Sequence, residues 1–266
     1  MSATTPEGVF RRDRVAVRAA LIALVLLAWL AVLAGAGTGM DPVAMSGWWL
    51  PSAPATDSAW TPAYGLIAFF MWVTMMVAMM LPSASPLVLL YAQVVRQAEG
   101  QGRAKSAPAS IAAFASGYLC LWILFSVLAV ALQWMLERAG ALSVLMSSRS
   151  FLLSGGLLIA AGLYQLTPPK AACLKHCRSP AAFIAAHWRP GVLGGWRMGL
   201  KHGLYCLGCC GVLMLLLFVG GVMNLVWIAG LTLLVALEKL APFGAAAERV
   251  TATVLIAGGA ALIVLG

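Results

Sequence analysis

The sequence predicts an all-α protein that crosses a membrane several times, folded as one transmembrane helical domain over residues 1–266. Of the 266 residues, 62% are hydrophobic and only 9% are charged, a balance that water-soluble domains do not show. Several apolar runs approach the ~20 residues with which a helix crosses a bilayer. The lipid bilayer is therefore the first expected partner.

Seven spans are predicted, and six is the alternative. The fifth and sixth runs are separated only by the stretch GGVMN, so they form either a tight helical hairpin or one longer bent element. The predicted spans are residues 19–35, 64–81, 111–136, 151–166, 203–221, 223–240 and 250–266.

The distribution of basic residues predicts a cytoplasmic N-terminus. With that orientation only Arg138 and Arg149, of 17 Lys and Arg residues, face outward, as the positive-inside rule requires. The polar N-terminus, residues 1–14, and a Cys/His loop at 167–200 are then cytoplasmic, and the Trp- and Pro-rich segment 37–64 is outside. We expect the first span to be an uncleaved signal anchor, and we expect a multi-pass protein of the bacterial inner membrane.

Several functional classes receive no support. The net charge of +9 does not predict nucleic-acid binding, because the basic residues lie singly or in small groups between apolar runs. No Walker loop, dinucleotide fingerprint or Ser/His/Asp constellation is visible, so an ATP-driven pump is not expected and no enzyme activity is predicted. An internal repeat, which many secondary transporters have, is not evident.

Three thiols inside the fifth predicted span are the strongest candidate site. Cys206, Cys209 and Cys210 stand at i, i+3 and i+4, so a helix projects all three from one face. Met214 extends this stripe by one turn, and His202, one turn earlier, could act as an entrance ligand. At 1.5 Å per residue, the cluster lies in the cytoplasmic half of the membrane.

A second cluster with the same spacing follows the fourth span. Cys173, His176 and Cys177 again stand at i, i+3 and i+4. If this piece is helical, it offers two sulfurs and an imidazole on one side in the 167–200 segment.

A third cluster is the methionine-rich second span. Met71, Met75 and Met79 form one row, and Met76 and Met80 form a parallel one. The chain runs inward here, so Met79 and Met80 reach the depth of the thiols. Pro82 and Pro86 free backbone carbonyl groups, which neighbouring parts of the protein must satisfy.

These side chains predict a soft-metal site. Thiolate and thioether ligands favour copper(I), and Cys with His also suits zinc or another thiophilic ion. Copper(I) is the first choice, because two or three soft ligands are enough to hold it in lipid. The candidate ligands are Cys206, Cys209, Cys210, Cys173, His176, Cys177, Met79, Met80, Met75 and Met214.

Other residues have simpler interpretations. Cys120 stands alone and is interpreted as a small hydrophobic residue. His187 is interpreted as a residue at the membrane interface. Glu238 is expected at a span end, paired with Lys201 or Lys239.

The chain resembles a bacterial family of integral membrane proteins of unknown function that are predicted to bind metal. The resemblance rests on MWVTMMVAMMLPSASP, on GLYQLTPPKAACLKHCRSP, and on GLKHGLYCLGCCGVLMLLLFVGGVMN followed by LEKLAP. It implies an all-helical membrane protein with a metal site at Cys173, Cys177, Cys206, Cys209 and Cys210, supported by Met79 and Met80. Family members often carry Trp after the thiol pair, where this chain has Gly211.

Three functions are compatible with these features. The first is the handling of copper(I): either its transport, or its delivery to a membrane copper enzyme. A soluble metallochaperone is a possible partner in either case. The second is a thiol–disulfide relay across the membrane, although helical i, i+4 cysteines pair only with distortion. The third is an accessory or scaffold subunit, for which the small-residue runs FASGY, SGG, AAGLY and AGGAA would allow close helix packing.

Overall fold

The computed structural model describes residues 6–39, 42, 60–142, 150–241 and 244–265, and every regular element in these ranges is a helix. The prediction of an all-α protein is confirmed for this part of the chain. Residues 1–5, most of the predicted outer segment at 37–64 and Arg149 lie outside the described residues. The helices are α1 (Pro6–Leu33), η1 (Gly35–Gly37), α2 (Pro62–Gly100), α3 (Ala107–Arg138), α4 (Phe151–Gln165), α5 (Pro168–Arg178), α6 (Pro180–His187), α7 (Gly191–Met214), α8 (Leu217–Gly220), α9 (Leu225–Leu240) and α10 (Gly244–Leu265).

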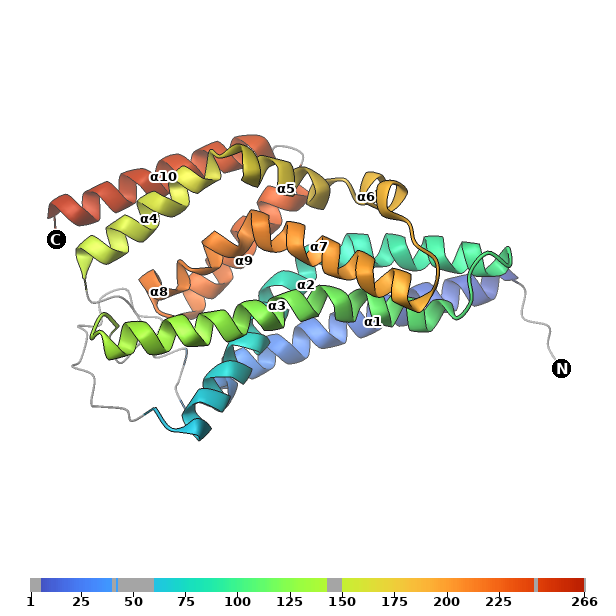
Figure 1. Ribbon diagram of the computed structural model, residues 1–266, viewed down its shortest axis with the longest axis horizontal. Coiled ribbons are helices and arrows are strands. Elements are labelled where there is room, and N and C mark those ends of the chain that lie inside the picture. The colour runs from blue at the N-terminus through green and yellow to red at the C-terminus, as the bar shows by residue number, and fades with distance from the viewer. Residues whose placement is uncertain (1–5, 40–41, 43–59, 143–149, 242–243, 266) are drawn as a thin grey trace.

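The helices form an elongated bundle (Figure 1). The pair α4 and α10 lies along one side, while α1, α2 and α3 lie on the other. Helices α7 and α9 lie between the two groups; α7 packs along α3, and α5 packs across α7. The centre of the bundle is therefore built mainly by α2, α3, α7 and α9.

Five described helical segments are long and apolar enough to cross a membrane: Val15–Leu33, Pro62–Gly100, Ala107–Arg138, Gly191–Gly220 and Ala246–Leu265. The pair α4 and α5, bent by 65°, would make a sixth span if it crosses as one unit. Two predicted spans are shorter than the ~20 residues needed: α4 has 15 residues and α9 has 16. The predicted count of seven and the orientation stay predictions.

Helix α2 continues through both of its prolines. Pro82 has no N–H to donate to the carbonyl of Ala78. The indole Nε1 of Trp29, on α1, donates to that oxygen at 3.2 Å instead. The carbonyl of Met80 accepts from the hydroxyls of Ser83 and Tyr118. The expectation that neighbouring groups satisfy the backbone near these prolines is confirmed at this turn.

Small residues set the two closest helix contacts. A Cβ atom added to Gly199 of α7 would overlap the carbonyl of Phe114, and one on Gly117 of α3 would overlap that of Trp196. In the other pair, a Cβ on Gly155 of α4 would come within 2.6 Å of the Gly259 carbonyl on α10. The small-residue runs therefore allow these backbones to touch, as the sequence predicts.

The chain after α4 differs from the expected loop. Residues 167–200 form α5, α6 and the first turns of α7, because Pro168 and Pro180 each occupy a first helical turn, where their fixed φ is favourable. The fifth and sixth predicted spans form a tight hairpin rather than one bent helix: Gly221 has a φ of 96°, and Asn224 caps α9 by accepting from Val226 and Trp227.

Candidate metal centre

Helix α7 carries its three thiols toward the interior of the bundle. Cys206, Cys209 and Cys210 are all at most 1% exposed, and they belong to the largest buried apolar cluster. The close α3–α7 approach at Gly199 and Gly203 fixes the rotation of α7 that turns this face inward. The Sγ atoms of Cys209 and Cys210 lie 3.2 Å apart.

Helix α5 brings a fourth thiol to this group. Cys177 Sγ lies 3.7 Å from Cys209 Sγ, although the two belong to different helices. The approach depends on Gly208: a Cβ atom there would stand 2.7 Å from Cys173 Sγ. Tyr164, at the end of α4, donates its hydroxyl to the Gly208 carbonyl. The two cysteine motifs, which the sequence could only place on the same side of the membrane, therefore meet, and the thiol cluster consists of Cys177, Cys206, Cys209 and Cys210.

A lysine from α9 completes the cluster. Lys239 is 6% exposed, and its Nζ donates to Cys206 Sγ at 3.0 Å and to Ser83 Oγ at 3.2 Å. Its charge also interacts with Cys177, Cys209 and Cys210. A buried ammonium group is costly unless it has partners, and here Cys206 and Ser83 are those partners.

Tyr118 of α3 connects the thiols with the methionine-rich helix. Its hydroxyl lies 3.2 Å from Cys206 Sγ and donates to the Met80 carbonyl at the same distance. Through Tyr118 and Lys239, the Pro82 turn of α2 is joined to α7. The four candidate methionines, Met75, Met79, Met80 and Met214, are among the seven buried methionines of the apolar cluster that also contains the α7 thiols.

The sulfur spacing is compatible with a bound metal ion, but the side chains do not form a complete coordination site. Among the described residues, no three His, Cys, Asp or Glu side chains are arranged around one metal position. With metal–sulfur bonds of ~2.3 Å, two sulfurs on one tetrahedral ion lie ~3.8 Å apart. The Cys177–Cys209 separation of 3.7 Å matches that spacing, whereas Cys209 and Cys210, at 3.2 Å, would rotate apart. The donors are soft sulfur atoms, the ligand type that copper(I) prefers, and three of the four are fully buried.

Comparison with protein families decides which class of protein this is. Residues 69–262, from the methionine-rich part of α2 into α10, match the family described as PpoB2, copper chaperone. The chain belongs to this copper chaperone family. The match includes every thiol of the cluster and Lys239. No curated protein and no solved structure matches the chain.

Membership of the PpoB2 copper chaperone family agrees with the predicted association with copper and with a role in handling metal rather than in catalysis. It agrees in part with the resemblance to a metal-binding family. The residues that hold the metal, its oxidation state and the protein that receives it stay proposals.

Two predicted candidates lie apart from the thiol cluster. His176 stacks on Tyr205 with ring centres 4.1 Å apart, and its Nδ1 contacts the Ala172 carbonyl. Cys173 is half-buried against Gly208. His202, which the sequence suggests as an entrance ligand, is buried between Phe183 and Tyr118. Cys120, which is not a predicted ligand, is exposed. The α5 motif thus supplies one thiol, Cys177, to the cluster.

The predicted pairing of Glu238 with Lys201 or Lys239 is wrong. Glu238 binds Lys170 of α5 at 2.7 Å, and both side chains are at most 1% exposed. Gln165 donates to the other carboxylate oxygen at 2.6 Å, and Arg178 donates to the Glu238 carbonyl. These bonds fix α5 to α9, because the 65° bend after α4 turns Lys170 inward.

Sequence reasoning missed Lys239, Tyr118 and Lys170 as parts of this region. A charged pair inside the otherwise apolar stretch LEKLAP was the available signal, since intramembrane charges usually have partners and a function. Their partners come from other helices, so spacing along the chain could not identify them.

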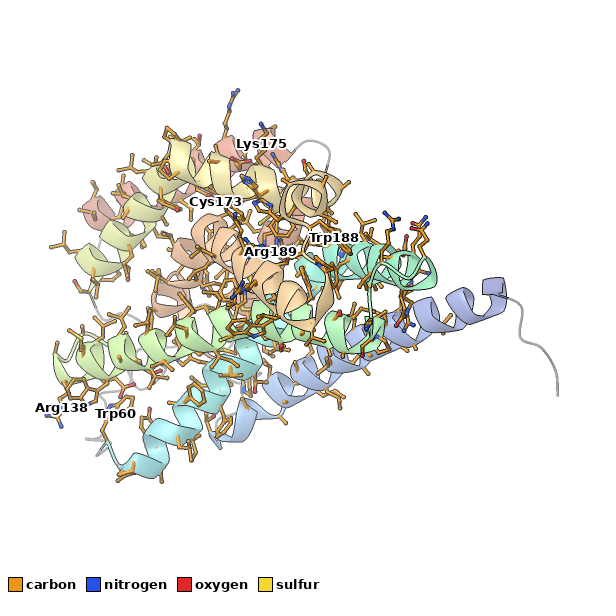
Figure 2. All side chains as sticks on the ribbon, turned by 45° about the vertical axis from the view of Figure 1, so that its right-hand side comes forward. Trp60, Arg138, Cys173, Lys175, Trp188 and Arg189 are labelled. Atoms are coloured by element: carbon orange, nitrogen blue, oxygen red, sulfur yellow. The ribbon has the colours of Figure 1, made fainter. Side chains whose placement is uncertain are left out.

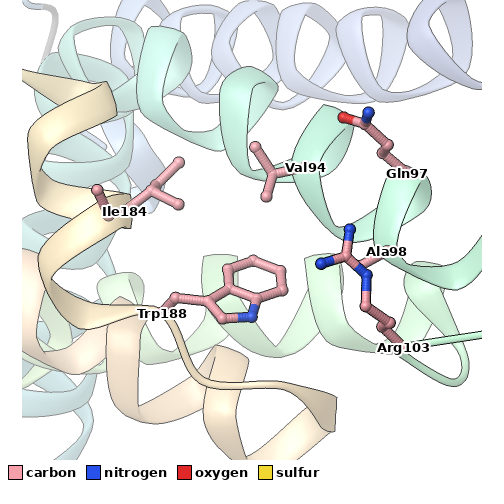
Figure 3. Close-up of a pocket in the computed structure, with 7 residues that line it drawn as sticks. Val94, Gln97, Ala98, Arg103, Ile184 and Trp188 are labelled. Carbon is pink, nitrogen blue, oxygen red and sulfur yellow. The ribbon is translucent and has the colours of Figure 1, made fainter. Parts of the chain in front are cut away.

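The surface of the bundle also has a shallow pocket that is separate from the thiol cluster. It has a volume of about 280 Å³ and lies between α2 and α6, with Val94, Ile184 and Trp188 as its apolar wall and Arg103 at one end (Figure 3). None of the four clustered thiols lines it.

Proposed function

We propose that the protein is an integral membrane copper(I) chaperone, which holds the ion on the buried thiols Cys206, Cys209 and Cys210 and exchanges it through Cys177. The contact that carries this proposal is the 3.7 Å separation of Cys177 and Cys209, because it joins a half-buried thiol to a fully buried pair. Family membership supports copper as the ion. Zinc or another thiophilic ion is the alternative cargo.

Exchange between neighbouring thiolates suits this environment. Copper(I) moved from sulfur to sulfur is never released as a hydrated ion, which a buried apolar core could not hold. Copper(I) on two thiolates carries one negative charge, and the ammonium group of Lys239 supplies one positive charge beside it. The buried complex is then neutral overall, which lowers its desolvation cost.

The side of the molecule from which copper is exchanged is proposed to be the α5 side. Figure 2 shows Cys173, Lys175, Trp188 and Arg189 well away from Trp60 and Arg138. Arg138 marks the C-terminal end of α3. Segments rich in Lys and Arg are typical of the cytoplasmic side. We therefore place exchange at the cytoplasmic face of the bacterial inner membrane, with a soluble metallochaperone as donor or a membrane copper enzyme as acceptor.

The thiol–disulfide relay is the second candidate, and the same 3.7 Å contact favours it. A disulfide requires a sulfur separation of ~2.05 Å, which small rotations of Cys177 and Cys209 could reach. A relay across the membrane also needs a second thiol pair near the other face. The one described cysteine outside the two motifs, Cys120, is solitary. The copper proposal uses every clustered thiol and Lys239, so we prefer it.

Copper retention tests the proposal. The detergent-purified, reduced protein is loaded with copper(I), passed through a desalting column and analysed for copper and protein, beside a Cys206, Cys209, Cys210 triple serine variant. We expect the unchanged protein to retain about one copper ion per chain more than the variant, because only the sulfur-bound ion depends on these three thiols. Equal and low copper in both proteins would contradict the proposal, and thiol labelling under oxidising conditions would then test the relay.

A further inference from the structure

Two of the three histidines lie beside each other where α5, α6 and α7 meet. The ring centres of His176, on α5, and His187, at the end of α6, are 6.3 Å apart. Both rings are near Tyr205 of α7: His176 stacks on it at 4.1 Å with the planes 6° apart, and His187 lies 6.3 Å from it. The three rings form one group that is partly open to the surroundings.

Each imidazole makes a hydrogen bond of the same type, from Nδ1 to the main-chain carbonyl four residues earlier. His176 Nδ1 lies 2.9 Å from the Ala172 carbonyl oxygen, and His187 Nδ1 lies 3.0 Å from that of Phe183. A carbonyl oxygen can only accept, so Nδ1 carries the proton in each ring and the lone pair of the neutral ring lies at Nε2. Metal-binding histidines are usually fixed in this way, by a bond from the second nitrogen to a carbonyl or carboxylate group.

The ring separation permits a shared ion. With metal–nitrogen bonds of ~2.0 Å, two imidazoles on one ion have ring centres roughly 5 to 6.5 Å apart. The observed 6.3 Å lies at the upper end, which corresponds to a wide angle at the metal. Packing alone would explain two aromatic rings here, but it would not require both Nδ1 atoms to be bonded to the main chain.

We infer that His176 and His187 form an imidazole site that captures copper(I) at the surface and passes it to the thiol cluster. This inference rests on the proposed function. His176 directly precedes Cys177, and Tyr205 directly precedes Cys206, so the histidine pair borders both helices that carry the thiols. Imidazole is a suitable ligand for copper, and thiolate is a softer one. Transfer from the half-exposed nitrogens to the buried sulfurs is therefore downhill.

The test uses the untagged, full-length protein in detergent, reduced and free of oxygen. Copper(I) is added against a chromophoric copper(I) chelator, and X-ray absorption at the copper edge identifies nitrogen and sulfur ligands. His176→Gln and His187→Gln each remove one imidazole. Lys175→Gln, an exposed change beside His176, is the matched control. Circular dichroism checks that each variant is folded.

We expect the first ion to be bound by sulfur and a further ion by two nitrogens. Each His→Gln variant loses the nitrogen-bound ion, with an affinity decrease of about 10-fold or more, and keeps the sulfur-bound one; Lys175→Gln keeps both. The Cys206, Cys209, Cys210 triple serine variant keeps the nitrogen-bound ion. Sulfur-bound copper without any nitrogen-bound ion would overturn this inference alone, as would nitrogen binding that survives in either His→Gln variant. If the unchanged protein binds no copper through sulfur, the proposed function is overturned instead.

Discussion

The ammonium group of Lys239 lies 3.0 Å from the thiol sulfur of Cys206, inside the apolar core of the bundle. The carboxylate next to it in sequence, Glu238, is already bound to Lys170. Lys239 is therefore left to the thiols and to Ser83, and a copper–thiolate complex at Cys206 would form beside a fixed positive charge.

Lys239→Met should weaken copper(I) binding by about 10-fold or more, which corresponds to ~1.4 kcal/mol. The buried negative charge of a copper–thiolate complex would lose its nearest positive charge. Competition with a chromophoric chelator measures the affinity. Lys239→Arg, which keeps the charge, should lose less, and Lys201→Met, which removes an exposed charge from α7, should lose nothing. Unchanged affinity in Lys239→Met would show that this charge plays no part in binding.

Cys177→Ser should slow the release of copper(I) to an external thiol acceptor by about 10-fold or more, because Cys177 links the buried thiols to the half-exposed α5 surface. Stopped-flow transfer to a thiol-containing chelator measures the rate. Cys120→Ser removes an exposed thiol outside the cluster and should transfer at the unchanged rate. Equal rates in the two variants would exclude Cys177 from the path.

Glu238→Gln should destabilise the protein by about 3 to 5 kcal/mol, because it leaves the buried ammonium of Lys170 without a charged partner. Thermal unfolding in detergent, followed by circular dichroism, measures the change. Replacing both members, Lys170→Met with Glu238→Leu, should cost much less, since no buried charge remains. A double variant as unstable as Glu238→Gln would show that the ion pair itself is needed to fix α5.

Gly208→Ala should push α5 away from α7, because the new Cβ atom would stand 2.7 Å from Cys173 Sγ. The Cys177–Cys209 separation then increases. The measurement is the rate at which a mild oxidant links these two thiols, with mass spectrometry of the cross-linked peptide. Gly230→Ala, where no atom lies within 4 Å of the added Cβ, is the control and should cross-link at the original rate. Equally fast cross-linking in Gly208→Ala would show that rotation of the Cys173 side chain accommodates the new Cβ atom and that Gly208 does not set the α5–α7 distance.

Hydrophobic runs and i, i+3, i+4 spacing were sufficient to predict the helices of the described residues and the single face of α7 that carries its three thiols, because both depend on local sequence. The helical hairpin before α9 was one of two open alternatives, and Gly221 with the Asn224 cap decides it. For α5, local spacing groups His176 with Cys173 and Cys177, and it could not show that Cys177 meets Cys209 while His176 stacks on Tyr205. Lys239 and Tyr118 reach Cys206 only through the packing of α9 and α3 on α7, which no pattern within one helix encodes.

The ligands of a single bound copper ion test the central claim most directly. X-ray absorption at the copper edge, on reduced protein loaded with one equivalent of copper(I), should show two or three sulfur ligands in the unchanged protein. Those sulfur ligands should be absent from the Cys206, Cys209, Cys210 triple serine variant. In the unchanged protein, a first copper ion bound only by nitrogen or oxygen would contradict a copper centre at the α7 thiols. The same sulfur ligands in the triple variant would contradict it too.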